Sequence, residues 1–376
     1  MNPNISVNLH QQNRFDVERW EHPTNPDELF IDLVDAVRRF VVLDNDQAVA
    51  IALWIVHTYF INRPGDEQVF DHSPILFITS PERQCGKSRL REIISRLVNK
   101  PLNCMNASLA SLFREIHNSQ PTLMLDEFDN FDLDRKSLIG ILNSGYKQDG
   151  SVMRQGGKAF DQTHHFSTWS AKLLAGIGNI PDTLQSRCIT IKMRRKLHTD
   201  SIESVNSILR EDQDYFNDIK RKIVDFVIEY EKDIISNVEV SEISDLDDRA
   251  QDNWSGLLRV AKFFGQEAFY SAKRSAHILS EPDEDEPSYG IELLKDINEF
   301  IHSFVGDHLP SLVLHAYLIS IEDRPWKYYK EKTLTTYALS KLLQPYGIKP
   351  EQVKHGESPI RGYRVTLLKE AISRYL

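Results

Sequence analysis

The strongest fold signal in this sequence is the stretch Pro74-Ile-Leu-Phe-Ile-Thr-Ser-Pro-Glu-Arg-Gln-Cys-Gly-Lys-Ser-Arg-Leu90. Residues 75–78 form an uninterrupted apolar run between Pro74 and Ser80, which is typical of a buried parallel strand. A polar loop follows over residues 81–88, and apolar residues then recur at helical spacing over 90–97. The stretch therefore predicts a strand, a loop and a helix in direct succession.

The loop has the spacing G-x-x-x-x-G-K-[ST] of a phosphate-binding P-loop, except that Pro81 replaces the first glycine. In such loops, backbone N–H groups and the helix N-terminus bind phosphate oxygens. We expect Lys87 to reach the β- and γ-phosphates of ATP and the Ser88 hydroxyl to bind Mg²⁺. A chance Gly-Lys-Ser on a surface loop is the alternative, and the flanking strand and helix argue against it. The predicted nucleotide-binding residues are Pro81, Glu82, Arg83, Gln84, Cys85, Gly86, Lys87, Ser88 and Arg89.

A second apolar strand, residues 122–125, ends in the paired carboxylates Asp126 and Glu127. Downstream of a P-loop, this pair is typical of a Walker B motif. We expect Asp126 to hold Mg²⁺, and Glu127 to orient and deprotonate the attacking water.

Two further residues are candidates for hydrolysis. Asn179 follows a third apolar strand, over 172–178, where a polar side chain can hold the attacking water. Arg187 lies where many ring-forming ATPases place an arginine that reaches a neighbouring subunit's nucleotide. A structural salt bridge is the alternative for Arg187. Arg249, in a predicted helix opening at Asp247, could sense the γ-phosphate, but pairing with nearby carboxylates is favoured.

Composition limits the class of protein. At 376 residues the chain is long enough for two or three domains, and its net charge of −10 argues against a uniformly basic nucleic-acid surface. Its three cysteines form no close pair, which indicates neither a zinc site nor a disulfide framework and agrees with a cytoplasmic protein. No apolar run reaches the roughly 18 residues of a spanning helix, so we expect no membrane segment.

The predicted organisation has six parts. The helix over 48–61 is apolar nearly all round, which predicts that it is buried against the nucleotide domain. The parts are a loose N-terminal tail (1–26), a helical segment (27–70), an ATPase core (71–197), a helical lid (198–280), an acidic linker (281–289) and a C-terminal domain (290–376).

Two basic regions are candidates for DNA contact. Gly156-Gly157 between two strand-like runs predicts a hairpin over 151–160, with Arg154 and Lys158 beside its tip. A solvated hairpin with incidental charges is the alternative.

The second region is the C-terminal segment 324–376, which has eleven Lys or Arg residues against four Asp or Glu. A short helix capped by Thr335 and a β wing over 361–365 predict a winged-helix-like module on DNA phosphates. A basic face used for packing or protein contact is the alternative. The candidate phosphate contacts are Lys341, Lys349 and Arg364.

Several blocks together carry a resemblance to a known family. They are residues 80–88, 125–127, 142–146, 172–178, 181–187, 248–254 and the terminal Arg361-Gly-Tyr-Arg run. From about residue 27 to its end, the chain resembles a domain of unknown function found in primase–helicase-like polypeptides of plasmids, prophages and actinobacterial genomes. The resemblance implies a P-loop ATPase related to the AAA+ and superfamily-three helicase group. Many such relatives also carry a primase domain, for which this sequence has no room, so a partner is expected to supply that activity.

The predicted fold is therefore α/β: an AAA+-like P-loop NTPase with a parallel-sheet core, N-terminal helices, a helical lid and a C-terminal winged-helix-like module. The first functional hypothesis is a DNA-dependent ATPase, a helicase or helicase-loader-like motor of mobile-element replication or phage defence. It would work as a homo-oligomer, with a hexameric ring as one arrangement, and with a primase, nuclease or effector as partner. An ATP-driven switch subunit that regulates a partner without unwinding is the second hypothesis, and a nucleotide kinase is the third.

Overall fold

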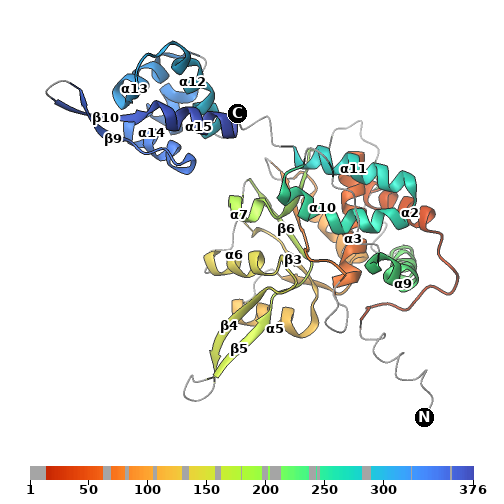
Figure 1. The fold of residues 1–376 in the computed structure, drawn as a ribbon. Coiled ribbons are helices and arrows are strands. Elements are labelled where there is room, and N and C mark those ends of the chain that lie inside the picture. Colours follow the sequence, from red (N-terminus) through yellow and green to blue (C-terminus); the bar gives the residue numbers. More distant parts are fainter. Residues whose placement is uncertain are drawn as a thin grey trace. The chain divides into compact units, whose positions relative to one another are not determined.

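The structure is a computed structural model. It describes residues 14–61, 69–80, 84–104, 108–128, 135–156, 162–178, 180–196, 202–203, 213–236, 243, 246–281, 289–322, 324–355 and 358–376. The chain divides into two compact units, Met1–Glu281 and Pro282–Leu376 (Figure 1). None of the described helices is both long and apolar enough to cross a membrane.

A parallel sheet organises the first unit, in the order β2-β3-β6-β1-β7. Its strands are β1 (Ile75–Ser80), β2 (Pro101–Cys104), β3 (Thr122–Leu125), β6 (Lys172–Ile177) and β7 (Cys188–Lys192). The strands predicted from apolar runs are confirmed. Because all five described strands run in one direction, their carboxyl ends meet at one edge of the sheet and their amino ends at the other. We call these the carboxyl edge and the amino edge.

Alternation along β1 divides the core into two layers. Ile75 and Phe77 face a cluster formed with α5 (Leu109–Ser119), α6 (Arg135–Ser144) and α7 (Asp182–Gln185). Leu76 and Ile78 belong to the core on the opposite face, where α4 (Lys87–Leu97) packs. A strand covered on both faces has no solvated side, which explains why its sequence is apolar without interruption.

The larger core is built around α3 (Asn45–Ile61), whose residues from Gln47 to Ile61 are all buried. Its neighbours are α2 (Pro26–Arg38), α9 (Gln213–Ser236), α10 (Asp248–Phe263) and α11 (Gln266–Ser280). The predicted burial of this helix is confirmed. The predicted start of α10 is also confirmed, because Asp247 caps it by accepting the Ala250 N–H at 2.7 Å.

The N-terminal segment over residues 14–25 is anchored to the body of the unit by its buried start and by ion pairs, which corrects the expectation of a loose tail there. Phe15 joins the larger core, and Arg14 is 8% exposed, donating to the Tyr59 carbonyl at 3.1 Å and pairing with Glu231 of α9. The chain is polar here because its charges pair with α9, a partner about two hundred residues away in sequence, which the local pattern could not reveal.

A two-stranded hairpin, β4 (Ser151–Gly156) and β5 (Gln162–Ser167), leaves the body of the unit beside α5 (Figure 1). The hairpin was predicted, but its return strand was placed too early. Gly156 pairs with Gln162, so the connection is longer than a Gly-Gly turn, and Lys158 lies outside the described residues.

The second unit combines helices with a small antiparallel sheet of order β8-β10-β9. In chain order its main elements are α12 (Tyr289–Ser303), β8 (His308–Pro310), α13 (Ser311–Ser320), the 3₁₀ helix η2 (Pro325–Glu331), α14 (Thr336–Leu343), β9 (Glu351–His355), β10 (Ser358–Arg364) and α15 (Val365–Tyr375). Thr335 caps α14 as predicted, accepting the Ala338 N–H at 3.1 Å. Of the predicted wing, residues 361–364 lie in β10, whereas Val365 is already the first residue of α15, so the predicted wing extends one residue too far.

Candidate functional site

A pocket of about 570 Å³ lies at the carboxyl edge, where the loop after β1 meets the ends of β3 and β6. The residues around it come from segments far apart in the chain. They are Phe40, Val41, Val42, Gln84, Cys85, Gly86, Lys87, Ser88, Arg89, Asp126, Glu127, Gly176, Ile177, Arg194, Lys196 and Ile202. The structure thus brings the predicted residues 84–89 together with both predicted carboxylates. Pro81, Glu82 and Arg83 lie outside the described residues.

The start of α4 forms one wall of this pocket. Gly86 precedes the helix with φ 88°, and no side chain caps the first turn. A Cβ at Gly86 would have only ordinary contacts at 3.7 Å, so the left-handed backbone rather than crowding favours glycine. Because the first N–H groups of a helix have no intrahelical acceptor, this end offers donors for an anion. Lys87 adds a cation, and its Nζ donates to Ser80 Oγ at 2.5 Å.

The carboxylates Asp126 and Glu127 come directly after β3 and also line the pocket. Asp126 Oδ1 accepts the Glu127 N–H at 3.0 Å, and Glu127 has a left-handed φ of 50°. Non-glycine residues in this region are strained, and such strain gathers at functional sites. Gln84 on the facing loop shares the feature with φ 65°.

Arg91 holds Asp126 in place and was missed by the sequence reasoning. Its Nε lies 3.0 Å from Asp126 Oδ2, and its Nη1 donates to Asn103 Oδ1 at 2.7 Å. Arg91 follows Lys87 by four positions on α4, so both side chains share one helix face. That spacing is a signal that could have found it.

The apolar residues of the pocket lining were also not predicted from the sequence. Residues 40–42 come from the corner between α2 and α3, and Ile202 comes from beyond β7. The chain after β7 is tied to this corner, because Gln47 Nε2 donates to the Lys192 carbonyl at 2.9 Å and Arg194 pairs with Asp44. Arg195 Nη2 donates to Gln84 Oε1 at 3.1 Å and so connects the same segment to the loop.

Asn179 lies outside the described residues, although its neighbourhood is defined. Gly176 and Ile177 of β6 line the pocket, and Thr79 Oγ1 donates to the Gly178 carbonyl at 3.0 Å. The segment before residue 179 therefore ends at the pocket, beside β1.

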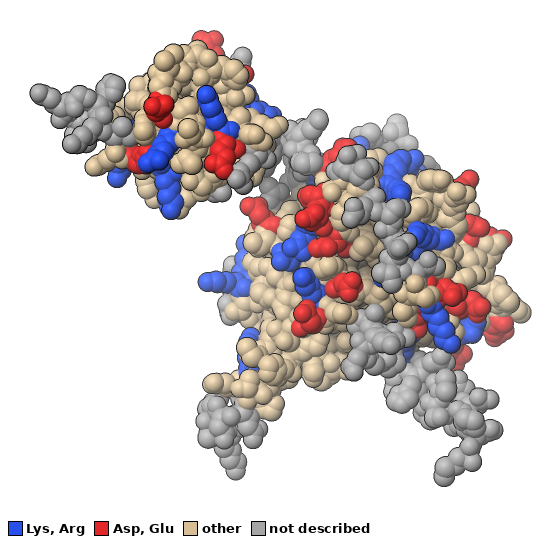
Figure 2. All heavy atoms as spheres, in the orientation of Figure 1, with Lys and Arg blue, Asp and Glu red and all other residues tan. Residues whose placement is uncertain are grey.

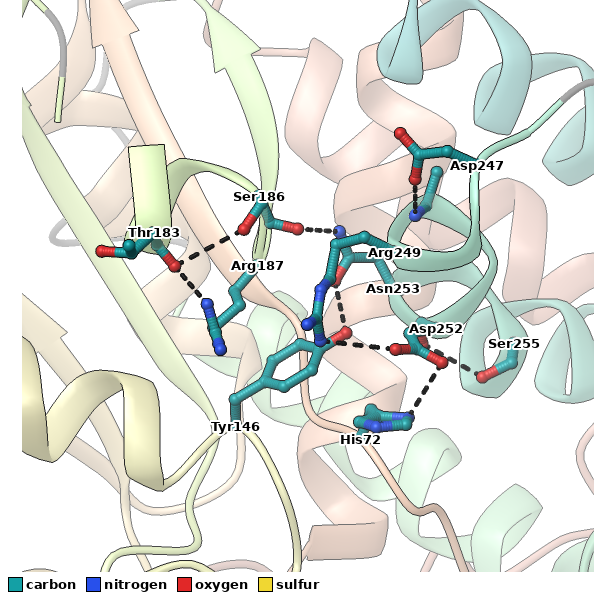
Figure 3. A network of polar contacts seen from close by, with 11 residues as sticks. His72, Tyr146, Thr183, Ser186, Arg187, Asp247, Arg249, Asp252, Asn253 and Ser255 are labelled. Carbon is teal, nitrogen blue, oxygen red and sulfur yellow. Dashed lines mark hydrogen bonds and ion pairs between the residues drawn. The ribbon is translucent and has the colours of Figure 1, made fainter. Parts of the chain in front are cut away.

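Arg187 does not line the pocket. It directly precedes Cys188, the first residue of β7, which pairs with Ile75 at the start of β1. Arg187 is therefore at the amino edge, beside Tyr146, with its Cζ 5.6 Å from the ring centroid. Its Nη1 donates to the Thr183 carbonyl (Figure 3). Among the described residues it has no ion pair with a carboxylate, so the salt-bridge alternative finds no support.

The amino edge is closely packed. The buried Lys172 donates to the carbonyls of Gly145 and Ser170, both at 2.7 Å, and burial lowers its pKa to about 7. A Cβ on Gly145 would lie 1.9 Å from the Thr168 carbonyl oxygen, so only glycine fits in front of Tyr146.

The candidate DNA-contacting cations have different surroundings. Arg154 is exposed on β4, with its Cζ 5.0 Å from the Phe113 ring. Lys341 and Lys349 are exposed in the second unit, whereas Arg364 is paired with Glu351 at 2.5 Å. On the face drawn in Figure 2, basic and acidic side chains are interspersed over each unit, so that face carries no extended positive patch.

Comparison with known proteins gives limited similarity. A family model described as "Protein of unknown function (DUF3631)" matches residues 192–375. That segment begins at the last residue of β7, so it excludes Lys87, Asp126 and Glu127 and is shorter than the resemblance expected from residue 27 onward. No curated protein matches the chain. Two apo structures of the NrS-1 C-terminal region are similar over 94% of this chain and 78% of theirs, at 12% identity, with TM-scores of 0.45 and 0.43.

Proposed function

We propose that this chain is a Mg²⁺-dependent P-loop ATPase. The observation that carries the proposal is a single pocket that gathers Lys87, Ser88, Asp126 and Glu127 from the ends of two parallel strands. In open parallel sheets, ligands bind outside the carboxyl ends of the strands. The volume of about 570 Å³ is within the range of small-molecule sites.

The lining fits a nucleoside triphosphate. The uncapped N-terminus of α4 and Lys87 supply donors and positive charge for phosphates. The apolar residues of the lining, Val41, Val42 and Ile202, suit a base. Arg194 and Lys196 add further cations to the same pocket.

The donor set also fits Mg²⁺. This ion is usually held by one or two carboxylates together with substrate phosphates and waters, rather than by a full protein cage. Asp126 and the Ser88 hydroxyl would hold it, and the bound ion would neutralise charge on the phosphates. Among the described residues, no three His, Cys, Asp or Glu side chains form a metal cluster.

Hydrolysis would use residues of this chain in separate roles. Glu127 would take a proton from the attacking water, and Asn179 would orient that water. Lys87 and the α4 N–H groups would stabilise negative charge as it develops on the transferred phosphoryl group. Arg187 would act on the nucleotide of a neighbouring subunit.

We further propose that ATP hydrolysis drives a helicase or helicase-loader-like motor on DNA. The β4–β5 hairpin projects from the ATPase unit, and Arg154 on it is exposed to solvent. In the second unit, Lys341 on α14 and Lys349, two positions before β9, are exposed. A switch subunit that contacts a protein partner is the second candidate. The pairing of Arg364 with Glu351 favours it, because this pairing neutralises one of the cations proposed to contact DNA phosphates.

The ATPase assignment is tested with Lys87→Ala and Glu127→Gln. Lys87→Ala should weaken binding of a labelled ATP analogue by about a hundredfold, because the variant cannot form charge-assisted hydrogen bonds with the phosphates. Glu127→Gln should bind ATP normally and hydrolyse it about 100-fold more slowly. The matched control is Lys192→Ala, an exposed lysine on β7 that does not line the pocket. Wild-type turnover in Glu127→Gln would contradict the assignment.

DNA binding is tested by reversing the charge of Lys341 and Lys349. Duplex binding should weaken, and the slope of log K against log salt should fall by about 0.9 for each phosphate that the protein no longer neutralises. Arg364→Gln is the comparison, because its cation is already paired and should matter less. An unchanged salt slope in the double reversal would favour the switch subunit.

A further inference from the structure

Two arginines from distant segments meet over one aromatic ring at the amino edge. Arg187 and Arg249 have their Cζ atoms 5.6 Å and 5.2 Å from the Tyr146 centroid. Tyr146 itself is 1% exposed. Figure 3 shows both guanidinium groups beside this ring, one arriving from the link between α7 and β7 and the other from the first turn of α10.

Few acceptors serve these two cations. Arg249 Nη1 lies 3.4 Å from Asp252, whereas Arg187 donates to a backbone carbonyl and its buried Nε has no acceptor among the described residues. Burial first, and then the charge of Arg249, lower the pKa of Arg187. His72 adds no fixed positive charge, because burial lowers its pKa despite Asp252 at 3.6 Å. The cluster therefore holds more positive than negative charge, and an anion would stabilise it.

Hydrogen bonds hold the Tyr146 ring and the segments that carry the two arginines in place. Tyr146 donates its hydroxyl to Asn253 Oδ1 at 2.8 Å, and burial raises the pKa of this phenol, which keeps the proton in place. Asn253 Nδ2 donates to the Ser186 carbonyl at 3.1 Å, one residue before Arg187. The turn after α6, the link before β7 and helix α10 are thus tied together, which pre-organises both guanidinium groups.

Neither arginine can serve the pocket of its own subunit. Arg187 directly precedes the first residue of β7, whereas Arg194, two positions past the last residue of the strand, lines the pocket. Five residues of strand span roughly 16 Å, more than an arginine side chain reaches. Arg249 contacts the same Tyr146 ring as Arg187 and therefore lies at the same edge of the sheet. It does not line the pocket either.

We propose that Arg249 is a second arginine that, together with Arg187, contacts the terminal phosphate of a nucleotide held by a second copy of this chain. The inference rests on the proposed ATPase function and deepens it. A terminal phosphate presents three charged oxygens, and two guanidinium forks can each bind it with paired hydrogen bonds. The lid helix α10 thereby belongs to the surface that a subunit offers to its neighbour.

The test separates the two subunit roles. Acceptor subunits carry Glu127→Gln, so that they hold ATP without turnover. Donor subunits carry Lys87→Ala, so that they present the arginine surface without nucleotide of their own. The affinity of trace labelled donor for acceptor is measured by sedimentation, with ATP and with ADP. Arg249→Gln in the donor should weaken binding to ATP-loaded acceptor by about tenfold, the value of one charge-assisted hydrogen bond, and have little effect with ADP.

Three donor variants sharpen the result. Arg187→Gln should weaken binding at least as much, and Arg249→Lys should weaken it less because it keeps the charge. Arg274→Gln is the matched control, since this arginine of α11 also pairs with a carboxylate, Asp46 at 2.9 Å, away from Tyr146. Thermal melts of each donor report whether the fold survives.

Several outcomes would overturn the inference. They are equal binding by intact and Arg249→Gln donors, equal weakening with ATP and ADP, or no nucleotide-dependent association at all. ATP binding to the acceptor alone is measured first. Its absence would remove the ATPase proposal itself, whereas ATP binding without an Arg249 effect would overturn only this inference.

Discussion

The two edges of the central sheet are built by different means. At the carboxyl edge, Asp126 and Glu127 directly follow β3, and Lys87 begins the helix after β1, so these residues come from short contiguous motifs around an open pocket. At the amino edge, Arg187 and Arg249 come from separate segments and rest on a buried Tyr146. The comparison shows an open pocket at one edge and a closely packed surface at the other.

The largest expected effect separates binding from turnover. Arg187→Ala should leave ATP binding to the pocket of each subunit intact and lower kcat by about 10³-fold, because the proposed arginine from a neighbour adds to the contacts of the pocket and acts most strongly on the charge of the transition state. Steady-state hydrolysis and equilibrium ATP binding are measured on the same preparation. Mixing inactive Arg187→Ala and Lys87→Ala subunits should restore part of the activity. Loss of ATP binding in Arg187→Ala would mean that Arg187 serves the site of its own subunit, which would contradict the separate roles proposed for the two edges.

The next prediction concerns Lys172, which is buried at the amino edge. Burial lowers the pKa of Lys172 to about 7, against 10.5 as its ordinary value. Between these values the unfolded chain binds more protons than the native one, so stability rises with pH. Relative to Lys172→Met, the wild type should gain about 1 kcal/mol per pH unit between pH 7.5 and 9.5. Urea unfolding at each pH measures this difference, and parallel curves for the two proteins would contradict it.

The smallest effect belongs to the carboxyl edge. Arg91 pairs with Asp126 and must yield part of that ion pair when Mg²⁺ binds there. Arg91→Leu should therefore lower the Mg²⁺ concentration for half-maximal ATP binding by about threefold, equivalent to roughly 0.6 kcal/mol. Arg96→Leu is the control on the same helix, because Arg96 pairs with Glu92 instead. A higher Mg²⁺ requirement in Arg91→Leu would mean that Arg91 orients the carboxylate for the ion.

Much of the fold was predictable because its signals are local. The apolar runs indicated β1, β3 and β6 although not β2, the all-round apolar pattern indicated the burial of α3, and Thr335 indicated the start of α14. The pocket residues that follow strands, Lys87 and Asp126 among them, were predictable for the same reason. Their nucleotide chemistry stays a prediction, as do the DNA contacts.

What the sequence could not reveal depends on contacts between distant segments. The apolar pocket wall at Val41 has no motif, because it is defined only by where the chain after β7 returns. The sequence of segment 14–25 does not show that the segment is anchored, because the anchoring depends on ion pairs with α9. The meeting of Arg187 and Arg249 over Tyr146 is likewise invisible until three segments are brought together.

The central position of α3 bears on how the protein is made and dissected. Its apolar surface is complete at Ile61, but three of the helices that cover it, α9 to α11, follow only from Gln213 onward. At ordinary rates of translation this leaves the helix without part of its cover for roughly ten to thirty seconds, an interval in which chaperones would be needed. The family-matched segment 192–375 starts inside the first compact unit and includes α9–α11 without α3. Expressed by itself, that segment would expose the partner surface of α3 and aggregate, so the family boundary does not mark an independently folding domain.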